Sequence, residues 1–280
     1  MPRTNPDTPR GSWSTPDLDA PRYSQSLARG LAILRCFTPE RPVLGIADIA
    51  DELGMSRSTT HRYVITLVAL GYLEQGASRK YRLGLHGTDL GLAALNSTGL
   101  REPAHLDLED LRNQTACTTS LAVLDKTEIV YLDRVRSATR GQDDTGDLGL
   151  GPGSRLPAYC TAMGKLLVAV RPQDERDRLV ADMTLTKRGP NTITSKKALV
   201  AELDAIRDED FAAGDQELAA GLYAIAAPVT NEKGDVVAAV SLAADSQAIS
   251  FDEMVERLGP PLVATAERIS ARLGYQGGEA

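Results

Sequence analysis

Short amphipathic segments separated by breaks make up the first third of the chain. Residues 24–37 carry leucines at helical spacing on one face, namely Leu27, Leu31 and Leu34. In residues 45–53, apolar side chains recur at i, i+3, i+4 and i+7, and Gly54 follows where a turn needs a positive φ. Ser56 can then cap a helix that runs to about residue 69. The pattern predicts three short helices.

A basic hairpin is predicted after these helices. Residues 72–74 and 79–83 read as two strands around a turn at Gly76, with basic residues beside the turn. Residues 86–97 form a short amphipathic segment that we interpret as a linker helix. We therefore expect a winged helix-turn-helix over residues 22–84 and a linker over residues 85–99.

The pattern changes from about residue 100, where hairpins alternate with helices. Helices are predicted at 103–117, from near Thr161, and at 172–181, 195–212 and 251–273; strands are predicted at 119–124, 128–136, 222–229 and 235–243. Residues 137–153 are rich in Gly, Asp, Ser and Thr and read as a loop. This mixture predicts an α+β domain with an antiparallel sheet over residues 100–275.

Bulk composition limits the class of protein. The 280 residues suffice for two domains, and no apolar run approaches the roughly 18–20 residues of a membrane span. Residues 1–21 are polar and lack the apolar core of a signal peptide, so we expect a disordered tail and a cytoplasmic protein. The three cysteines lie far apart, without a CxxC motif or a Cys/His cluster. We expect no cofactor, no structural zinc and no disulfide framework.

Charge is spread unevenly along the chain. The formal net charge is -7, which at first argues against a nucleic-acid partner. Residues 1–84, however, hold 11 basic and 8 acidic residues, whereas the remainder holds 20 basic and 30 acidic residues. This asymmetry is compatible with a small DNA-binding module attached to an acidic body.

The third predicted helix and the hairpin carry the candidate DNA-binding residues. The N-terminal end of a recognition helix enters the major groove, where Arg can bond guanine and Ser or Thr can reach bases or phosphates. The helix supplies Ser56, Arg57, Ser58, Thr59 and Arg62, and the hairpin supplies Arg79, Lys80 and Arg82 for backbone phosphates. The alternative is an ordinary solvated surface; the whole order of elements with a basic wing favours double-stranded DNA.

Several motifs resemble those of the IclR family of transcriptional regulators. They are SLARGLAILRCF, IADIADELGMSRSTTHRYVITLVALGYLE and YRLG in the first part, then GSRLPAYCTAMGKLLVA at 153–169, TLTKRGPNTIT at 184–194 and GLYAIAAPV at 221–229. The resemblance covers about residues 23–275. The QSLARGL opening and LPAYCTAMGK are most similar to regulators of aromatic-acid breakdown, the protocatechuate and 4-hydroxybenzoate branch.

This resemblance implies a GAF-like effector domain that binds a small organic acid. It also implies homodimers that pair through the DNA-binding domain and linker helix, often tetramers, and a pseudo-palindromic operator. Carried over by position, the effector pocket comprises Leu156, Ala162, Met163, Asp215, Ala224 and Ser241. Some members have Cys at the position of Ala224 and Ser at that of Ala243, so this pocket is expected to be less polar than theirs.

The residues themselves give independent but less decisive support for this pocket. Cys160 and Thr161 lead into a helix, and helix N-termini bind anions. Ser241 interrupts an apolar strand, so its hydroxyl needs a partner, either a ligand or a backbone carbonyl. Lys165 could attract a carboxylate or point to solvent. Arg134 and Arg136, alternating on a strand with Tyr131, could lie near the pocket, although pairing with acidic neighbours is favoured.

Two other classes of function stay open at this stage. An enzyme with Cys160 or Ser241 as nucleophile would need a base, and His105 is the only histidine outside the DNA module and linker. A small buried hydrophobe is the favoured interpretation of Cys160. A ligand-independent architectural role is the second alternative. The favoured function is a sequence-specific DNA-binding regulator controlled by a small carboxylate, an aromatic acid or its breakdown product.

Overall fold

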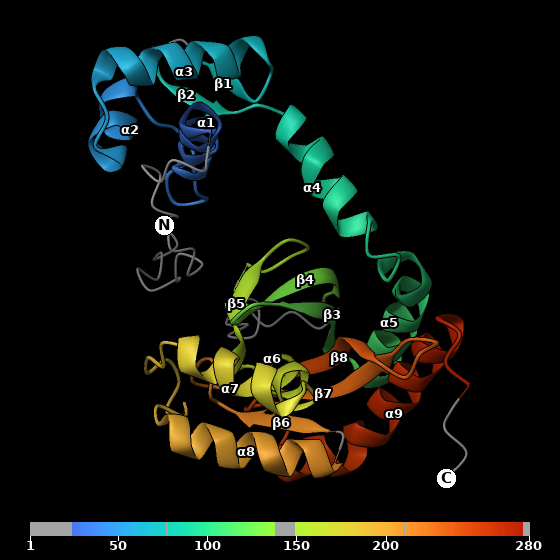
Figure 1. Ribbon diagram of the computed structural model, residues 1–280. Helices are drawn as coiled ribbons and strands as arrows, with labels where there is room; N and C mark the ends of the chain where they lie inside the picture. The colour runs from blue at the N-terminus through green and yellow to red at the C-terminus, as the bar shows by residue number, and fades with distance from the viewer. Residues whose placement is uncertain (1–23, 77, 138–148, 210, 277–280) are drawn as a thin grey trace. The chain divides into compact units, whose positions relative to one another are not determined.

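The computed structural model describes residues 24–76, 78–137, 149–209 and 211–276, which belong to two compact units (Figure 1). The first unit comprises residues 1–94 and the second comprises residues 95–280. The tail expected over residues 1–21 lies outside the described residues, as does most of the loop expected over residues 137–153. No helix in the described ranges is long and apolar enough to cross a membrane.

The first unit has the predicted order of helices and hairpin. Its elements are α1 (Gln25–Arg35), α2 (Ile46–Leu53), α3 (Arg57–Ala69), β1 (Leu73–Gln75), β2 (Tyr81–Leu83) and α4 (His86–Asn96). The strands pair antiparallel, with Glu74 opposite Arg82. Ile33, Ile49 and Val64, one from each of the first three helices, meet in a small apolar core. Gly54 ends α2 with φ of 63°, the conformation the sequence predicts there.

The leucine face of α1 belongs to this core only in part. Leu34 is partly buried and packs against it, whereas Leu27 and Leu31 are 64% and 52% exposed, and the residue that α1 fully buries is Ile33. Helical spacing therefore identified the helix correctly, but most of the face it marks lies outside the core. The described side chains of α4 are not buried either, although Leu85, Leu90 and Leu92 are large and apolar.

The second unit is built on a six-stranded antiparallel sheet with strand order β5-β4-β3-β8-β7-β6. The predicted strands are β3 (Thr118–Asp125), β4 (Glu128–Val135), β7 (Leu222–Thr230) and β8 (Val236–Asp245). The sequence analysis missed the short edge strands β5 (Arg155–Pro157) and β6 (Ala212–Asp215). Three or four residues are too few to show a period. Asp215, for which no strand was predicted, ends β6.

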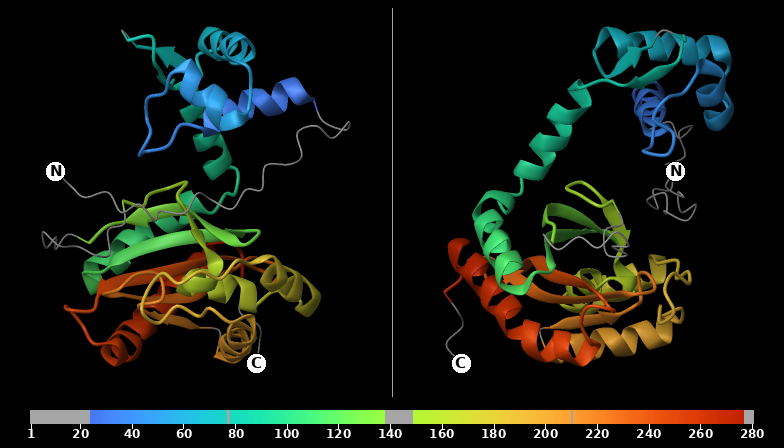
Figure 2. Two further views of the ribbon diagram at one scale, coloured as in Figure 1. Left: turned by 90° about the vertical axis from the view of Figure 1, so that its left-hand side faces the viewer. Right: turned by 180° about the vertical axis from the view of Figure 1, so that it is seen from behind.

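Helices cover both faces of this sheet (Figure 2). α5 (Arg101–Thr115) and α9 (Phe251–Arg272) pack on one face, and α6 (Ala162–Ala169) and α8 (Lys196–Glu209) lie on the other with α7 (Gln173–Asp182) beside them. Adjacent strand residues alternate between the two cores, as the pairs Leu121 and Ala122 and Ile225 and Ala226 show. The face toward α6 is rich in alanine, which lets this helix approach closely.

A β-bulge in β4 breaks the alternation at one place. Leu121 of β3 pairs with Asp133 and Ala122 pairs with Tyr131, so Leu132 is an extra residue. Leu132 packs toward α5 and α9, and the Asp133 carboxylate also contacts α5, through His105 at 2.7 Å. Bulges re-aim the side chains that follow them. Tyr131 and Arg134, three residues apart, consequently reach the same side of the sheet.

The tight packing of α6 leads to a prediction on stability. A methyl group at Gly164 would overlap the backbone of Ala158 and lie 2.5 Å from Thr161 Oγ1. We expect Gly164→Ala to lower the free energy of unfolding by about 1–3 kcal/mol, measured by urea denaturation followed by circular dichroism. Gly259→Ala in α9 is the matched control, because its methyl would meet the Phe211 ring at an ordinary 3.7 Å. Equal stability of both variants would contradict the packing argument.

Candidate functional site

The start of α3 is organised by a cluster of hydroxyl groups. Ser56 is the N-cap, and its Oγ accepts the Thr59 backbone N–H at 3.2 Å. The same Oγ donates to Thr59 Oγ1 at 2.8 Å and lies 3.1 Å from Ser58 Oγ. Thr60 Oγ1 donates to the Ser56 carbonyl at 3.1 Å. Ser56 and Thr59 are therefore engaged in capping the helix, whereas the sequence had placed them among the groups that contact DNA.

The outward face of α3 carries two arginines. Arg57, Ser58 and Arg62 are exposed and Thr59 is half-buried, while Thr60, Val64 and Leu67 are buried in the core. Burial of one stripe thus fixes which residues face solvent. The exposed residues include Arg57 and Arg62, the two arginines that the sequence predicts to contact DNA.

The basic wing, defined here as Arg79, Lys80 and Arg82, follows α3. All three side chains are exposed. Arg82 forms an ion pair with Glu74 across the hairpin, with its Nη2 and Nε at 2.7 and 2.9 Å from Glu74 Oε2. This pairing satisfies much of the Arg82 charge within the wing itself. Arg79 and Lys80, beside the turn, are thus better placed than Arg82 to meet an external anion.

A cavity opens in the second unit between the sheet and the start of α6. It measures about 540 Å³, counting the solvent at its mouth. Its walls are mostly apolar, with a few polar groups. They comprise Tyr131, Arg134, Leu150, Cys160, Thr161, Ala162, Met163, Gly214, Glu217, Leu218, Leu222, Ala224, Ser241 and Ala243.

Four of the six predicted pocket residues line this cavity, namely Ala162, Met163, Ala224 and Ser241. Leu156 does not. It is buried in the adjoining apolar core and pairs with Ile129 in the sheet. Asp215 is not in the cavity wall either, and its Oδ2 accepts a hydrogen bond from Asn191 Nδ2 at 2.9 Å. Gly214 and Asp215 are successive residues of β6, so the Asp215 side chain points away from the face of the sheet on which Gly214 lines the cavity.

The first turn of α6 presents its amides at the cavity. Thr161 is the N-cap, and its Oγ1 accepts the Gly164 N–H at 3.1 Å. The amides of Ala162 and Met163 precede that bond, at helix positions that have no acceptor within the helix. The partial positive charge of a helix N-terminus favours an anion here.

Arg134 brings a full positive charge to the same cavity. Its Nη1 donates to Ser120 Oγ at 3.1 Å, and its guanidinium carbon lies 5.4 Å from the centre of the Tyr131 ring. The sequence favoured acidic partners for Arg134 and Arg136. The bulge directs Arg134 into the cavity wall, and Arg136 donates to the Leu150 carbonyl at 3.2 Å. Tyr131 is buried, and this burial raises the pKa of its phenol.

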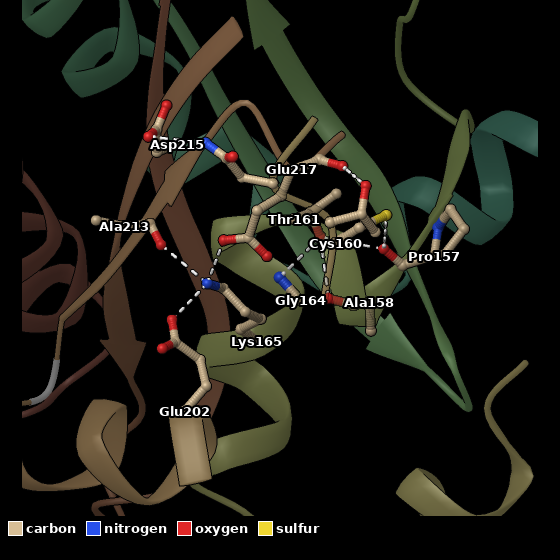
Figure 3. Close-up of polar contacts among 12 residues, drawn as sticks. Pro157, Ala158, Cys160, Thr161, Gly164, Lys165, Glu202, Ala213, Asp215 and Glu217 are labelled. Atoms are coloured by element: carbon tan, nitrogen blue, oxygen red, sulfur yellow. Dashed lines mark hydrogen bonds and ion pairs between the residues drawn. The ribbon is translucent and has the colours of Figure 1, made fainter. Parts of the chain in front are cut away.

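Lys165 is joined to several groups at this site (Figure 3). Its side chain is only 1% exposed. Its Nζ donates to Glu217 Oε1 at 2.5 Å, to Glu202 Oε1 at 2.6 Å and to the Ala213 carbonyl at 3.0 Å. Of the two alternatives that the sequence left open for Lys165, a side chain pointing to solvent is excluded. A buried ammonium group persists only with such partners. Lys165 is therefore committed to protein groups and does not offer its charge to a ligand.

Glu217 is a cavity residue that the sequence analysis missed. It is 7% exposed and lines the wall, and only its Oε1 receives the Lys165 ammonium. Its Oε2 is buried and accepts no hydrogen bond from the described part of the chain. Burial raises the pKa of Glu217, while Lys165 opposes that rise. A single acidic residue between two strands carries no periodic signal that could have revealed this.

Cys160 lies in the cavity wall as a buried thiol. Burial raises its pKa to about 12, so the reactive thiolate is scarce at neutral pH. The cavity wall, as far as the described residues form it, contains no histidine. Within the same residues, His, Cys, Asp and Glu side chains do not gather in threes as metal ligands would.

Comparison with known proteins gives family matches in both units. The model for the IclR helix-turn-helix domain matches residues 26–77, and the model for the bacterial transcriptional regulator IclR C-terminal domain matches residues 92–271. The transcriptional regulator KdgR of Escherichia coli is 33% identical over 263 residues, covering 92% of this chain and 97% of its own. The p-hydroxybenzoate hydroxylase transcriptional activator of Acinetobacter baylyi is 30% identical over 256 residues, covering 91% and 94%.

A solved structure agrees with this assignment. An IclR homolog of Microbacterium hydrocarbonoxydans, complexed with 4-hydroxybenzoate, superposes with a TM-score of 0.76 at 27% identity, covering 89% of this chain and 98% of its own. The two family matches together cover most of the chain. The first falls on the winged helix-turn-helix and the second on the unit with the six-stranded sheet. The chain belongs to the IclR family of transcriptional regulators, with a DNA-binding domain followed by a ligand-binding C-terminal domain.

Proposed function

We propose that this regulator senses a small carboxylate, best an aromatic acid, and that this ligand controls its binding to a specific operator. The observation that carries the proposal is the meeting of Arg134 and the first turn of α6 at one apolar cavity. Arg pairs well with a carboxylate, and free helix amides add further donors. The Tyr131 ring and Met163 offer apolar surface to an aromatic ring.

Two relatives support the aromatic class. One is named an activator for p-hydroxybenzoate hydroxylase, and another is solved with 4-hydroxybenzoate bound. Ala224 and Ala243 add apolar wall where some family members have a polar side chain, which favours a ring over a very small polar acid. The cellular site we propose is the cytoplasm, where chromosomal DNA is accessible.

For the DNA, we propose that Arg57 and Arg62 read base edges while Arg79 and Lys80 hold the phosphate backbone. The exposed arginines at the N-terminal part of α3 support the first assignment, since that end of a recognition helix enters the major groove. Ser58, exposed beside them, is a further candidate for a base or phosphate. Ser56 and Thr59 contribute mainly by capping, and Arg82 contributes less than its neighbours because Glu74 holds it.

We further propose a homodimer, or a tetramer built from such dimers, that pairs through α1 and α4. Leu27 and Leu31 on α1 and Leu85, Leu90 and Leu92 in and before α4 are exposed apolar side chains in one unit. Large exposed apolar side chains that recur along one helix are typical of an interaction surface. A two-fold dimer would match a pseudo-palindromic operator.

An enzyme with Cys160 as its nucleophile is not favoured. The raised thiol pKa removes the thiolate, and His105 is occupied elsewhere, with its Nδ1 2.7 Å from Asp133 Oδ2 on the α5 side of the sheet. A nucleophile needs an adjacent base, which these positions do not supply. We therefore propose a sensor domain without catalytic activity. A purely architectural role predicts that the cavity binds no ligand. Binding of an aromatic acid in the calorimetric test would exclude that role.

The first test concerns base reading by Arg62. We expect Arg62→Ala to weaken binding to the operator by about 1–3 kcal/mol, roughly 5- to 150-fold, with a smaller loss on random DNA. Fluorescence anisotropy with a labelled operator and a scrambled duplex measures both. Arg79→Ala is the control, because losing a phosphate contact should weaken both duplexes alike and lower the salt dependence. An equal loss on both duplexes for Arg62→Ala would refute base reading.

The second test concerns the carboxylate. Arg134→Gln should weaken binding of 4-hydroxybenzoate roughly 10- to 150-fold, the value of a hydrogen bond to a charged group, as measured by isothermal titration calorimetry. Arg155→Gln is the control, since Arg155 pairs with Asp125 and Glu128 outside the cavity wall. Unchanged affinity in the Arg134 variant, or no binding of any aromatic acid to the unmodified protein, would contradict the proposed site.

The third test concerns the dimer. Leu27→Glu should shift the protein toward monomer in sedimentation equilibrium, because the charge would have to be buried in the interface. Leu106→Glu is a matched control at 62% exposure, on α5 of the other unit, and should not change the mass. If both variants sediment as the unmodified protein does, α1 does not pair the subunits.

A further inference from the structure

The buried oxygen Glu217 Oε2 lies at the cavity wall and receives no hydrogen bond from the residues that the structure describes. Glu217 is more than nine-tenths buried and lines the cavity wall, and its other oxygen is held by Lys165 at 2.5 Å. Among the described residues, nothing donates to Oε2. Buried acceptors in native proteins nearly always have a partner, so a group left without one indicates a missing donor.

The Glu217 carboxylate and the start of α6 both lie close to Gly214. A methyl group built on Gly214 would lie 3.6 Å from Glu217 Oε1 and 3.9 Å from the Ala162 nitrogen. Gly214 and Glu217 both line the cavity, and so does Ala162. The absence of a side chain at Gly214 therefore keeps open the space into which the carboxylate and the helix amides face.

We propose that Glu217 is a specificity residue of this cavity and accepts a hydrogen bond from a hydroxyl or amino group of the ligand. The effector class is then a hydroxylated or aminated carboxylic acid, and not a plain one. This inference rests on the proposed function, since it concerns the same cavity. A site with a buried acceptor rejects the analogue that lacks the donor, because the acceptor then stays unpaired.

The charges of the cavity set the orientation of such a ligand. A carboxylate is attracted by Arg134 and repelled by Glu217, so the acid end binds toward the arginine. The donor of the ligand then reaches toward Glu217. Lys165 keeps Oε1 occupied and restrains the Glu217 side chain, which leaves Oε2 as the oxygen that meets the ligand.

The experiment compares ligands that differ only in the donor. We would titrate the full-length protein by calorimetry with 3- and 4-hydroxybenzoate and with 3- and 4-fluorobenzoate, in which fluorine replaces the hydroxyl with little change in size. We expect at least one hydroxybenzoate to bind at least tenfold more tightly than its fluoro partner. In Glu217→Gln, Lys165 demands the amide oxygen, so the amide NH₂ faces the cavity and the preference should fall to within about threefold.

A matched control separates the acceptor from its ion pair. Glu202→Gln removes the other carboxylate that Lys165 contacts, and Glu202 is not in the cavity wall. This variant should keep the preference for hydroxybenzoate. Glu217→Asp retains the charge that Lys165 needs but withdraws it by one methylene, so it serves if the Gln variant does not fold, and it should also reduce the preference. Thermal unfolding verifies each fold.

The possible results distinguish the role of Glu217 from the proposed aromatic effector. If fluoro- and hydroxybenzoates bind the unmodified protein equally, the role of Glu217 is wrong and the carboxylate cavity stands. If the hydroxyl preference persists in the Glu217 variants, another residue reads the hydroxyl and the inference is overturned. If no benzoate binds at all, the proposed aromatic effector itself fails, and the inference with it.

Discussion

The buried Lys165 ammonium is the interaction on which the effector cavity depends. It joins three elements far apart in sequence, because it reaches from α6 to Glu202 of α8, to the Ala213 carbonyl of β6 and to Glu217. Lys165 and Glu217 form a buried ion pair, and breaking such a pair typically costs about 3–5 kcal/mol. The first turn of α6 and the Glu217 carboxylate are therefore held beside Gly214 at the cavity wall.

The bulge in β4 adds the second constraint. One extra residue turns Asp133 toward α5, where its Oδ2 lies 2.7 Å from His105 Nδ1 and 3.9 Å from Arg101 Nε, and sends Arg134 to the cavity. Successive residues of one strand thus line the cavity and contact the helix that follows α4 in the chain. A strand in strict alternation could not place Tyr131 and Arg134 on the same side, since they are three residues apart.

In the DNA-binding unit, some polar residues stabilise the fold and others are exposed. Burial of Thr60, Val64 and Leu67 leaves Arg57 and Arg62 on the exposed side of α3, while Ser56 and Thr59 hydrogen-bond each other to begin the helix. In the wing, Glu74 forms an ion pair with Arg82, while Arg79 and Lys80 are exposed beside the turn. Residues of similar chemistry therefore have different roles, which depend on their neighbours rather than on their type.

The sequence by itself determined the elements that have a period or a punctuating residue. Helical spacing, Gly54 and the Ser56 cap located α2 and α3, short apolar runs located β3, β4, β7 and β8, and Thr161 located the start of α6. These signals are local, since each arises from residues a few positions apart. The tertiary structure alone decided which face of α1 is buried, that Lys165 points inward, that the bulge turns Arg134 to the cavity, and that Glu217 rather than Asp215 lines its wall. Those outcomes depend on contacts between residues tens of positions apart, which no local pattern records.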